Sequence, residues 1–276
     1  MDPKSLLGWL LTGANVAAFS AAFAIAVLQY TYGAFLARGT PGEQRARGYA
    51  LMYDAMEGVV IGMMFFLGVF SLTPLVLVGY RFPSPPEAAG KFSDAAQRFS
   101  KWLLDLAFLE RDLTLLPIFA PLATTIAASA LLGRVAVQVL LGLSTGMAAA
   151  AQLMNDYGPY LFGTGLALAC TSRTRRLGVY LAVTAISVCI TLGLASNHVA
   201  AVADSLTFEY SSGNIIDFVT KGLLQQAISQ LLEDGKTAAM GLITLSISLA
   251  IAAVAAAAAS SAAGGFADSI ISRIRL

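Results

Sequence analysis

The sequence predicts an all-α, polytopic integral membrane protein, and three observations carry this prediction. The 276-residue chain is 57% hydrophobic and only 12% charged, whereas about a quarter of the residues in a soluble globular chain are charged. Its mean hydropathy is +0.74. Charged residues are also absent from long stretches, among them 58–80, 135–155 and 177–203. Each stretch is longer than the ~18 apolar residues typical of a membrane-spanning helix.

These stretches are interpreted as about seven transmembrane helices in a single membrane domain, residues 1–276. The expected spans are 6–36, 58–80, 113–133, 135–155, 157–172, 177–203 and 237–267. Only Gly133 and Arg134 separate the third span from the fourth, and they are predicted to be the hinge of a tight hairpin. At about 1.5 Å per residue the first span exceeds a ~30 Å hydrocarbon core, so it is expected to tilt or project.

Two segments between the spans, 81–112 and 204–236, are predicted to form external amphipathic helices in the membrane interface. Ser93 is the expected N-cap of the first helix, Asn214 that of the second, and Gly235 is expected to end the second. The alternative for the first helix is packing on other helices of the protein. The apolar residues at helical spacing in it are Phe92, Ala95, Ala96, Phe99, Trp102, Leu103, Leu106 and Leu109.

The distribution of basic residues predicts the topology. Lys and Arg in short loops stay on the cytoplasmic side of a membrane, and the R-T-R-R turn that begins at Arg173 is the densest such cluster between two apolar runs. Placing this turn inside gives a multi-pass protein of the cell (plasma) membrane with its N-terminus outside and its C-terminus inside. The five basic residues of segment 81–112 oppose this orientation, but they are interspersed with acidic residues.

The basic turn is the first candidate functional site. Arg173, Arg175 and Arg176 are expected to contact lipid or an acidic partner, because anionic headgroups attract each such charge by about 1 kcal/mol. The glycines on either side permit close approach of two helices. The hairpin glycines are Gly163, Gly165 and Gly178.

The sequence lacks the motifs of a nucleotide-hydrolysing P-loop and of a zinc protease, and the protein is predicted not to be an enzyme and to bind no cofactor or metal. There is no G-x-x-x-x-G-K-[ST] segment and no H-E-x-x-H. G-x-S-x-G occurs once, as GLSTG at residues 142–146 inside an apolar run, whereas a nucleophile elbow needs a strand-to-helix turn. The seven expected spans also carry no charged residue at their centres, where ion-coupled transporters usually have one. A secondary transporter or small-solute channel stays open as the alternative, because the fourth span carries several polar side chains. The candidate lumen-lining residues are Gln138, Ser144, Thr145 and Gln152.

The stretch GTGLALACTSRTRRLGVYLA, residues 163–182, resembles the hairpin of the polytopic inner-membrane subunit of type IV secretion and conjugation systems. It is most similar to the relative of that subunit in the crenarchaeal DNA-import (Ced) system. In this family a glycine-containing helix ends in a short basic turn, and the next apolar helix begins at once. The basic C-terminal tail GGFADSIISRIRL fits the same pattern, and the Lys-poor composition resembles the archaeal members.

The resemblance implies a function that the motifs described above do not indicate. It implies a membrane channel or platform subunit of a machine for DNA transfer or import. Such a subunit is expected to form a homo-oligomer at the base of a pilus and to work with a separate hexameric ATPase and with pilin subunits. Single-stranded DNA is the expected cargo.

Overall fold

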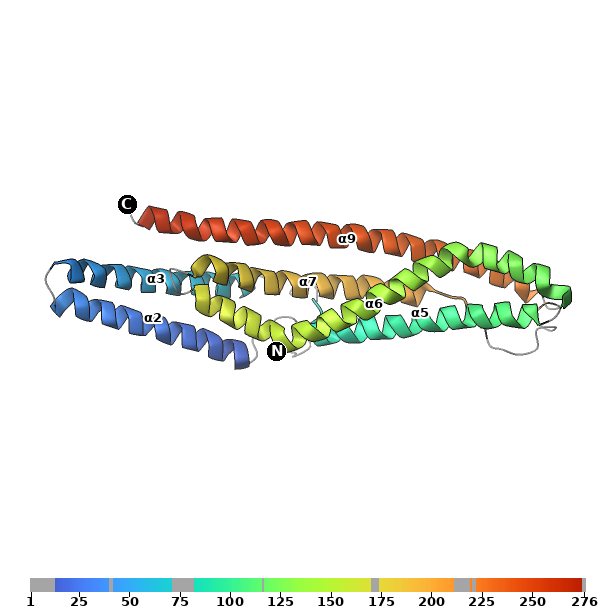
Figure 1. Ribbon diagram of the computed structural model, residues 1–276, viewed down its shortest axis with the longest axis horizontal. Helices are drawn as coiled ribbons and strands as arrows, with labels where there is room; N and C mark the ends of the chain where they lie inside the picture. The colour runs from blue at the N-terminus through green and yellow to red at the C-terminus, as the bar shows by residue number, and fades with distance from the viewer. Residues whose placement is uncertain are drawn as a thin grey trace. The chain divides into compact units, whose positions relative to one another are not determined.

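The computed structural model describes residues 13–39, 42–70, 82–115, 117–169, 174–210, 219 and 222–274. Within these residues every regular element longer than three residues is an α-helix, so the prediction of an all-α chain is confirmed there (Figure 1). The elements are α2 (Gly13–Gly39), α3 (Glu43–Phe70), α5 (Pro85–Thr114), η1 (Pro117–Phe119), α6 (Ala120–Ala169), α7 (Arg175–Ser205) and α9 (Leu223–Ile274).

In the described part of the chain, four helices are long and apolar enough to cross a membrane. They are Ser20–Gly39, Pro117–Ala169, Arg175–Ser205 and Leu223–Ala259. This agrees with a membrane protein, but the count of seven spans is not confirmed. The expected span 58–80 extends beyond α3 into residues outside the described ranges.

The predicted hairpin between residues 113–133 and 135–155 is wrong. α6 runs without a break for 50 residues through Gly133, Arg134 and Pro159, so it also takes in most of the expected fifth span. A single glycine costs a helix only about 1 kcal/mol, and contacts in the fold offset that cost. Arg134 forms an ion pair with Glu110, and Gly133 packs against Gly235 of α9. At about 1.5 Å per residue α6 is about 75 Å long, more than twice the hydrocarbon thickness.

The predicted helix end at Gly235 is also wrong. α9 continues through Gly235 for 52 residues, from Leu223 to Ile274. This glycine serves the packing of two helices: a Cβ built on it would lie 3.1 Å from the backbone nitrogen of Gly133. The expected N-cap, Asn214, lies outside the described residues.

By contacts the chain forms two compact units. Unit 1 comprises Met1–Pro85, Leu153–Thr191 and Ile251–Leu276, and unit 2 comprises Pro86–Gln152 and Leu192–Ala250. Each of the helices α6, α7 and α9 has one part in unit 1 and its other part in unit 2. The sequence predicts one membrane domain and contains no linker that separates these two units.

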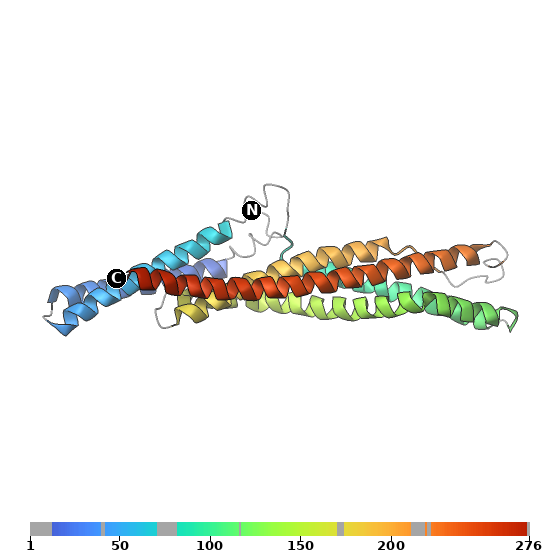
Figure 2. The same cartoon turned by 90° about the horizontal axis from the view of Figure 1, so that it is seen from above.

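In unit 1, α2 and α3 form an antiparallel hairpin (Figures 1 and 2). Two glycines bring the helices into backbone contact near the turn, since a Cβ on Gly33 would lie 2.7 Å from the carbonyl oxygen of Gly48. The turn itself contains Gly42 at φ +78°, a left-handed conformation that glycine adopts without strain.

In unit 2, α5 packs its apolar face on the other helices. Phe92, Phe99, Leu106 and Leu109 are fully buried, and Trp102 is nearly so. The predicted amphipathic pattern is therefore present, but its apolar face is covered by protein, as in the alternative that the sequence left open. The helix also begins earlier than Ser93, at Pro85; proline is well tolerated in a first turn because no intrahelical partner for its missing N–H exists there.

Candidate functional site

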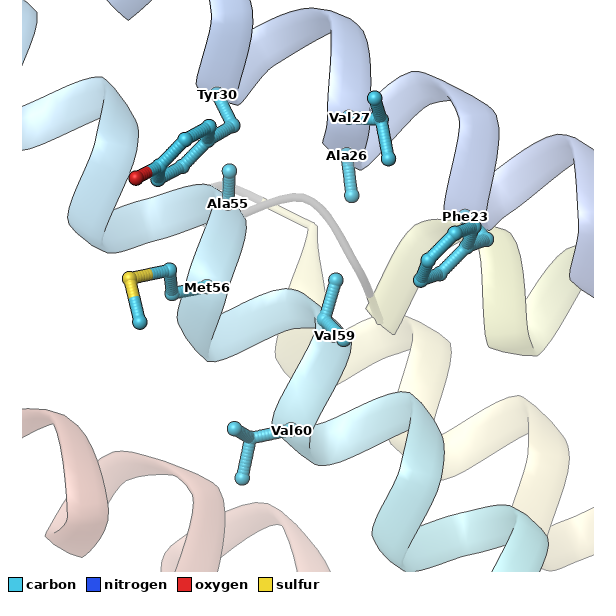
Figure 3. Close-up of a pocket in the computed structure, with 8 residues that line it drawn as sticks. All are labelled: Phe23, Ala26, Val27, Tyr30, Ala55, Met56, Val59 and Val60. Carbon is cyan, nitrogen blue, oxygen red and sulfur yellow. The ribbon is translucent and has the colours of Figure 1, made fainter. Parts of the chain in front are cut away.

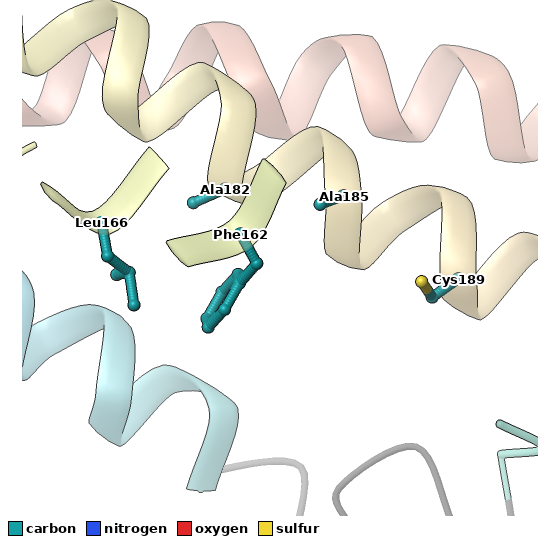
Figure 4. Packing of buried hydrophobic residues seen from close by; sticks show 5 residues of the cluster. All are labelled: Phe162, Leu166, Ala182, Ala185 and Cys189. Carbon is teal, nitrogen blue, oxygen red and sulfur yellow. The ribbon is translucent and has the colours of Figure 1, made fainter. Parts of the chain in front are cut away.

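The predicted hairpin of α6 and α7 is present, and its glycines allow the two backbones to touch. A Cβ on Gly178 would lie 2.2 Å from the backbone nitrogen of Ala169, and one on Gly165 would lie 2.7 Å from that of Ala182. Gly163 is also buried. Figure 4 shows the apolar cluster that continues this contact, with Phe162 and Leu166 on α6 and Ala182, Ala185 and Cys189 on α7.

The last carbonyl groups of α6 are bonded by residues at the start of α7. The final four C=O groups of a helix have no partner within it. Here the Thr174 hydroxyl donates to the Leu168 carbonyl at 3.0 Å, and Nε of Arg175 donates to the Ala169 carbonyl at 3.2 Å. The arginine charge also lies at the negative end of the α6 dipole, which is a favourable position for a cation. Thr174 and Arg175 therefore satisfy the last two carbonyl groups of α6.

Arg175 joins a third helix to this turn. Its guanidinium forms an ion pair with the Glu57 carboxylate of α3 at 3.0 Å and donates to the Asp54 carbonyl at 3.4 Å. Only 2% of Arg175 and 9% of Glu57 are exposed. The contact with Glu57 is a charge pair without hydrogen-bond geometry, and the hydrogen bonds of the guanidinium go to the Ala169 and Asp54 carbonyl groups. A buried charge needs both a counter-charge and hydrogen bonds, and these contacts together hold α3 against the start of α7.

The expectation that all three arginines contact lipid or a partner is therefore wrong for Arg175, whose side chain is directed into the protein. Arg176 is exposed, and Arg173 lies outside the described residues. Adjacent residues of a helix point about 100° apart. Arg175 can therefore face the interior of the protein while Arg176 faces outward. Sequence reasoning also missed Glu57, which directly precedes the apolar stretch 58–80; an acidic residue beside a long apolar run is the signal that marks it.

The four lumen-lining candidates lie in unit 2 and do not share one face of α6. Ser144 is fully buried and donates to the Leu140 carbonyl at 2.6 Å. Gln138, Thr145 and Gln152 are exposed, and their spacing of seven residues places them on one outer face of the helix. Thr145 borders an open groove of about 480 Å³ between α5 and α6. These four residues therefore do not surround a pore within unit 2.

A polar cluster around Asp234 was not anticipated from the sequence. This residue of α9 is only 1% exposed. Its carboxylate accepts hydrogen bonds from Nε1 of Trp102 at 2.9 Å, from the backbone N–H of Phe208 at 2.9 Å and from the backbone N–H of Thr207 at 3.0 Å. It thereby ties α5, α9 and the segment that follows α7 to one another, and both of its oxygens act as acceptors.

Replacing Asp234 with asparagine is expected to destabilise the protein by about 1–3 kcal/mol, because the amide NH₂ would face a hydrogen-bond donor in either orientation. The measurement is the free energy of unfolding in mixed detergent micelles. Glu233→Gln, an equivalent change at the exposed neighbouring residue, is the control and should leave it within error. Equal effects of the two changes would contradict the role assigned to Asp234.

Polar side chains in the second half of α5 also contact the segment after α7. Lys101 pairs with Glu209 at 2.6 Å, and this hydrogen bond raises the pKa of the lysine and lowers that of the glutamate. Both side chains are well exposed, so the pair contributes little to stability. The Tyr210 hydroxyl donates to Asp112 at 3.0 Å, and burial together with this carboxylate raises the pKa of Tyr210 to about 12.

Comparison with known protein families, curated proteins and solved structures found no match to this chain. The assignment of a function therefore depends on the residues and contacts described above.

Proposed function

We propose that this protein is a non-enzymatic membrane subunit, acting as a platform or channel, of a conjugation-like machine for DNA transfer or import. The observation that carries the proposal is the α6–α7 turn. It combines backbone contact at Gly165 and Gly178 with an exposed basic residue, Arg176. The resemblance to the membrane subunit of conjugation systems rests on the same residues.

The two arginines of α7 support this function in different ways. Arg175 holds the turn to α3 through Glu57, so the position of the exposed Arg176 is fixed relative to three helices. An exposed arginine held in this position, on the cytoplasmic side, suits contact with anionic lipid or with an acidic surface of a separate ATPase. The ATPase and pilin partners belong to the proposal through the resemblance.

The outer polar face of α6 supports a path formed by several copies of the chain. Gln138, Thr145 and Gln152 face outward at seven-residue spacing, so in a ring of copies such a face would line a shared lumen. Uncharged polar groups contact a passing single strand weakly, whereas a dense array of Lys and Arg would bind the phosphates tightly. A solute pore within a single chain receives no support from these residues.

The test is DNA exchange between genetically marked strains after deletion of the gene. Complementation with the unchanged gene is expected to restore exchange. Complementation with Arg173→Gln/Arg176→Gln is expected to leave exchange at least about tenfold lower, because a lost multi-charge contact of about 1.4 kcal/mol or more changes an equilibrium tenfold. Arg175 is left unchanged in this variant, so that α3 stays bound to the turn.

Two controls show whether a loss of exchange comes from Arg173 and Arg176 themselves or from misfolding or a general loss of charge. Membrane levels and the unfolding free energy of the double variant should match those of the unchanged protein, and Arg38→Gln/Arg47→Gln removes the same charge from exposed positions beside the α2–α3 turn. Exchange that persists after deletion of the gene would overturn the proposed function. Solute-dependent transport by the purified protein in liposomes would then favour the transporter alternative.

A further inference from the structure

The α2–α3 hairpin of unit 1 contains an apolar groove of about 300 Å³. Four side chains come from each helix (Figure 3), with Ala26 and Ala55 as small residues between larger ones and the rings of Phe23 and Tyr30 at opposite ends. The groove begins where the close contact of Gly33 and Gly48 gives way to helices separated by side chains. The lining residues are Phe23, Ala26, Val27, Tyr30, Ala55, Met56, Val59 and Val60.

The residues of this hairpin follow the order of a bilayer leaflet. Arginines lie nearest the turn, at positions 38, 45 and 47. Exposed tyrosines come next, at positions 30 and 32 on α2 and 49 and 53 on α3, and the apolar groove follows. Charged residues at the headgroups, Tyr in the interface and apolar residues below are the pattern of a membrane boundary. On the outward face of the hairpin the groove therefore lies below the tyrosines, at the depth of acyl chains, while Glu57 at the same depth of α3 is paired with Arg175 inside the protein.

One arginine is placed above the groove. Arg45 precedes Met56 by eleven residues of α3, which is close to three full turns, so the two share one face about 16 Å apart along the axis. Both are exposed. This spacing is about half the thickness of the hydrocarbon core, and it places a guanidinium where the phosphate of a lipid with a chain in the groove would lie. Arg47 lies on the opposite side of α3, because two residues turn a helix by about 200°.

We propose that this groove is a binding site for one acyl chain of an anionic phospholipid, whose phosphate group is held by Arg45. The apolar lining excludes a polar ligand, and the guanidinium favours an anionic headgroup over a zwitterionic one. The inference is independent of DNA transfer, because it concerns only the α2–α3 hairpin and its lipid.

The test uses the full-length protein in phosphatidylcholine nanodiscs that contain phosphatidylglycerol with a diazirine on one acyl chain. After photolysis, labelled residues are mapped by mass spectrometry. Label is expected on the groove-lining residues at Met56, Val59 and Val60. Val27→Trp, which fills the groove, is expected to lower this label at least about threefold. Ile25→Trp is the matched control outside the lining set, since 49% of Ile25 and 46% of Val27 are exposed.

A second pair of variants tests the headgroup contact. Arg45→Gln is expected to reduce the labelling preference for phosphatidylglycerol over phosphatidylcholine bearing the same probe at least about threefold, whereas Arg47→Gln leaves the preference unchanged. Each variant counts as folded when its unfolding free energy and its labelling outside the groove both match those of the unchanged protein. Label spread evenly around the hairpin, or equal effects of Val27→Trp and Ile25→Trp, would each overturn the proposal.

Discussion

Replacing Arg175 with methionine is expected to lower the free energy of unfolding by about 3–5 kcal/mol, which is the usual cost of removing one partner of a buried ion pair. The change leaves the Glu57 carboxylate buried without its cation and also removes a hydrogen bond from the Ala169 carbonyl. Arg176→Met, at the exposed neighbour, is expected to change the unfolding free energy by less than about 0.5 kcal/mol.

The double variant Arg175→Met/Glu57→Leu separates the ion pair from packing. With both charges removed, no uncompensated carboxylate remains, and most of the lost stability is expected to return, because a buried pair is often replaced by apolar residues at little cost. Unfolding in mixed detergent micelles measures all three variants. A double variant as unstable as Arg175→Met would show that the loss came from packing or from the hydrogen bonds to carbonyl groups. The ion pair would then not be the cause of the lost stability.

The second large effect is expected at Gly178. The Cα hydrogen of Gly178 that takes the place of a side chain is directed at the backbone of α6, where a methyl group would lie 2.2 Å from the Ala169 nitrogen and 2.5 Å from the Gly165 oxygen. Backbone atoms cannot rotate aside as a flexible side chain can, so Gly178→Ala must push α6 and α7 apart. We expect a loss of about 1–3 kcal/mol or more, the usual range for overpacking.

Gly142→Ala is the matched control for this change, and it should have the opposite sign. A Cβ on Gly142 meets nothing within 4 Å, so alanine there only improves the helix propensity of α6, by up to about 1 kcal/mol. The unfolding free energy of Gly178→Ala should therefore be lower than that of the unchanged protein, and that of Gly142→Ala should be higher. Equal stabilisation by both would mean that α6 and α7 do not touch at Gly178.

Long-range composition predicted the helical class well, but local breaks in the sequence were poor guides to where helices end. Gly133, Arg134, Pro159 and Gly235 all resemble helix ends, yet each lies inside a helix. The reason is tertiary: Gly133 and Gly235 provide space for α6 and α9 to approach each other, and Arg134 has an acidic partner on α5. Residues far away in the sequence decide these cases, so a local pattern does not reveal them.

The predicted close contact of α6 and α7 at Gly165 and Gly178 is present, but the roles of the arginines were not separable from the sequence. Arg175 and Arg176 are chemically identical neighbours, and only the position of α3 makes one of them buried. Glu57 is the deciding residue, and it lies more than one hundred positions earlier in the chain. A pairing over that separation leaves no trace in periodicity or composition.

This same pairing imposes an order on biogenesis. Synthesis begins at the N-terminus, so α3 and its Glu57 leave the ribosome well before Arg175 has been translated. The salt bridge therefore forms late, after the end of α6 and the start of α7 have both arrived beside α3. Until then the Glu57 carboxylate of the nascent protein has no cationic partner. The salt bridge can form only when α3, α6 and α7 have all reached their native positions.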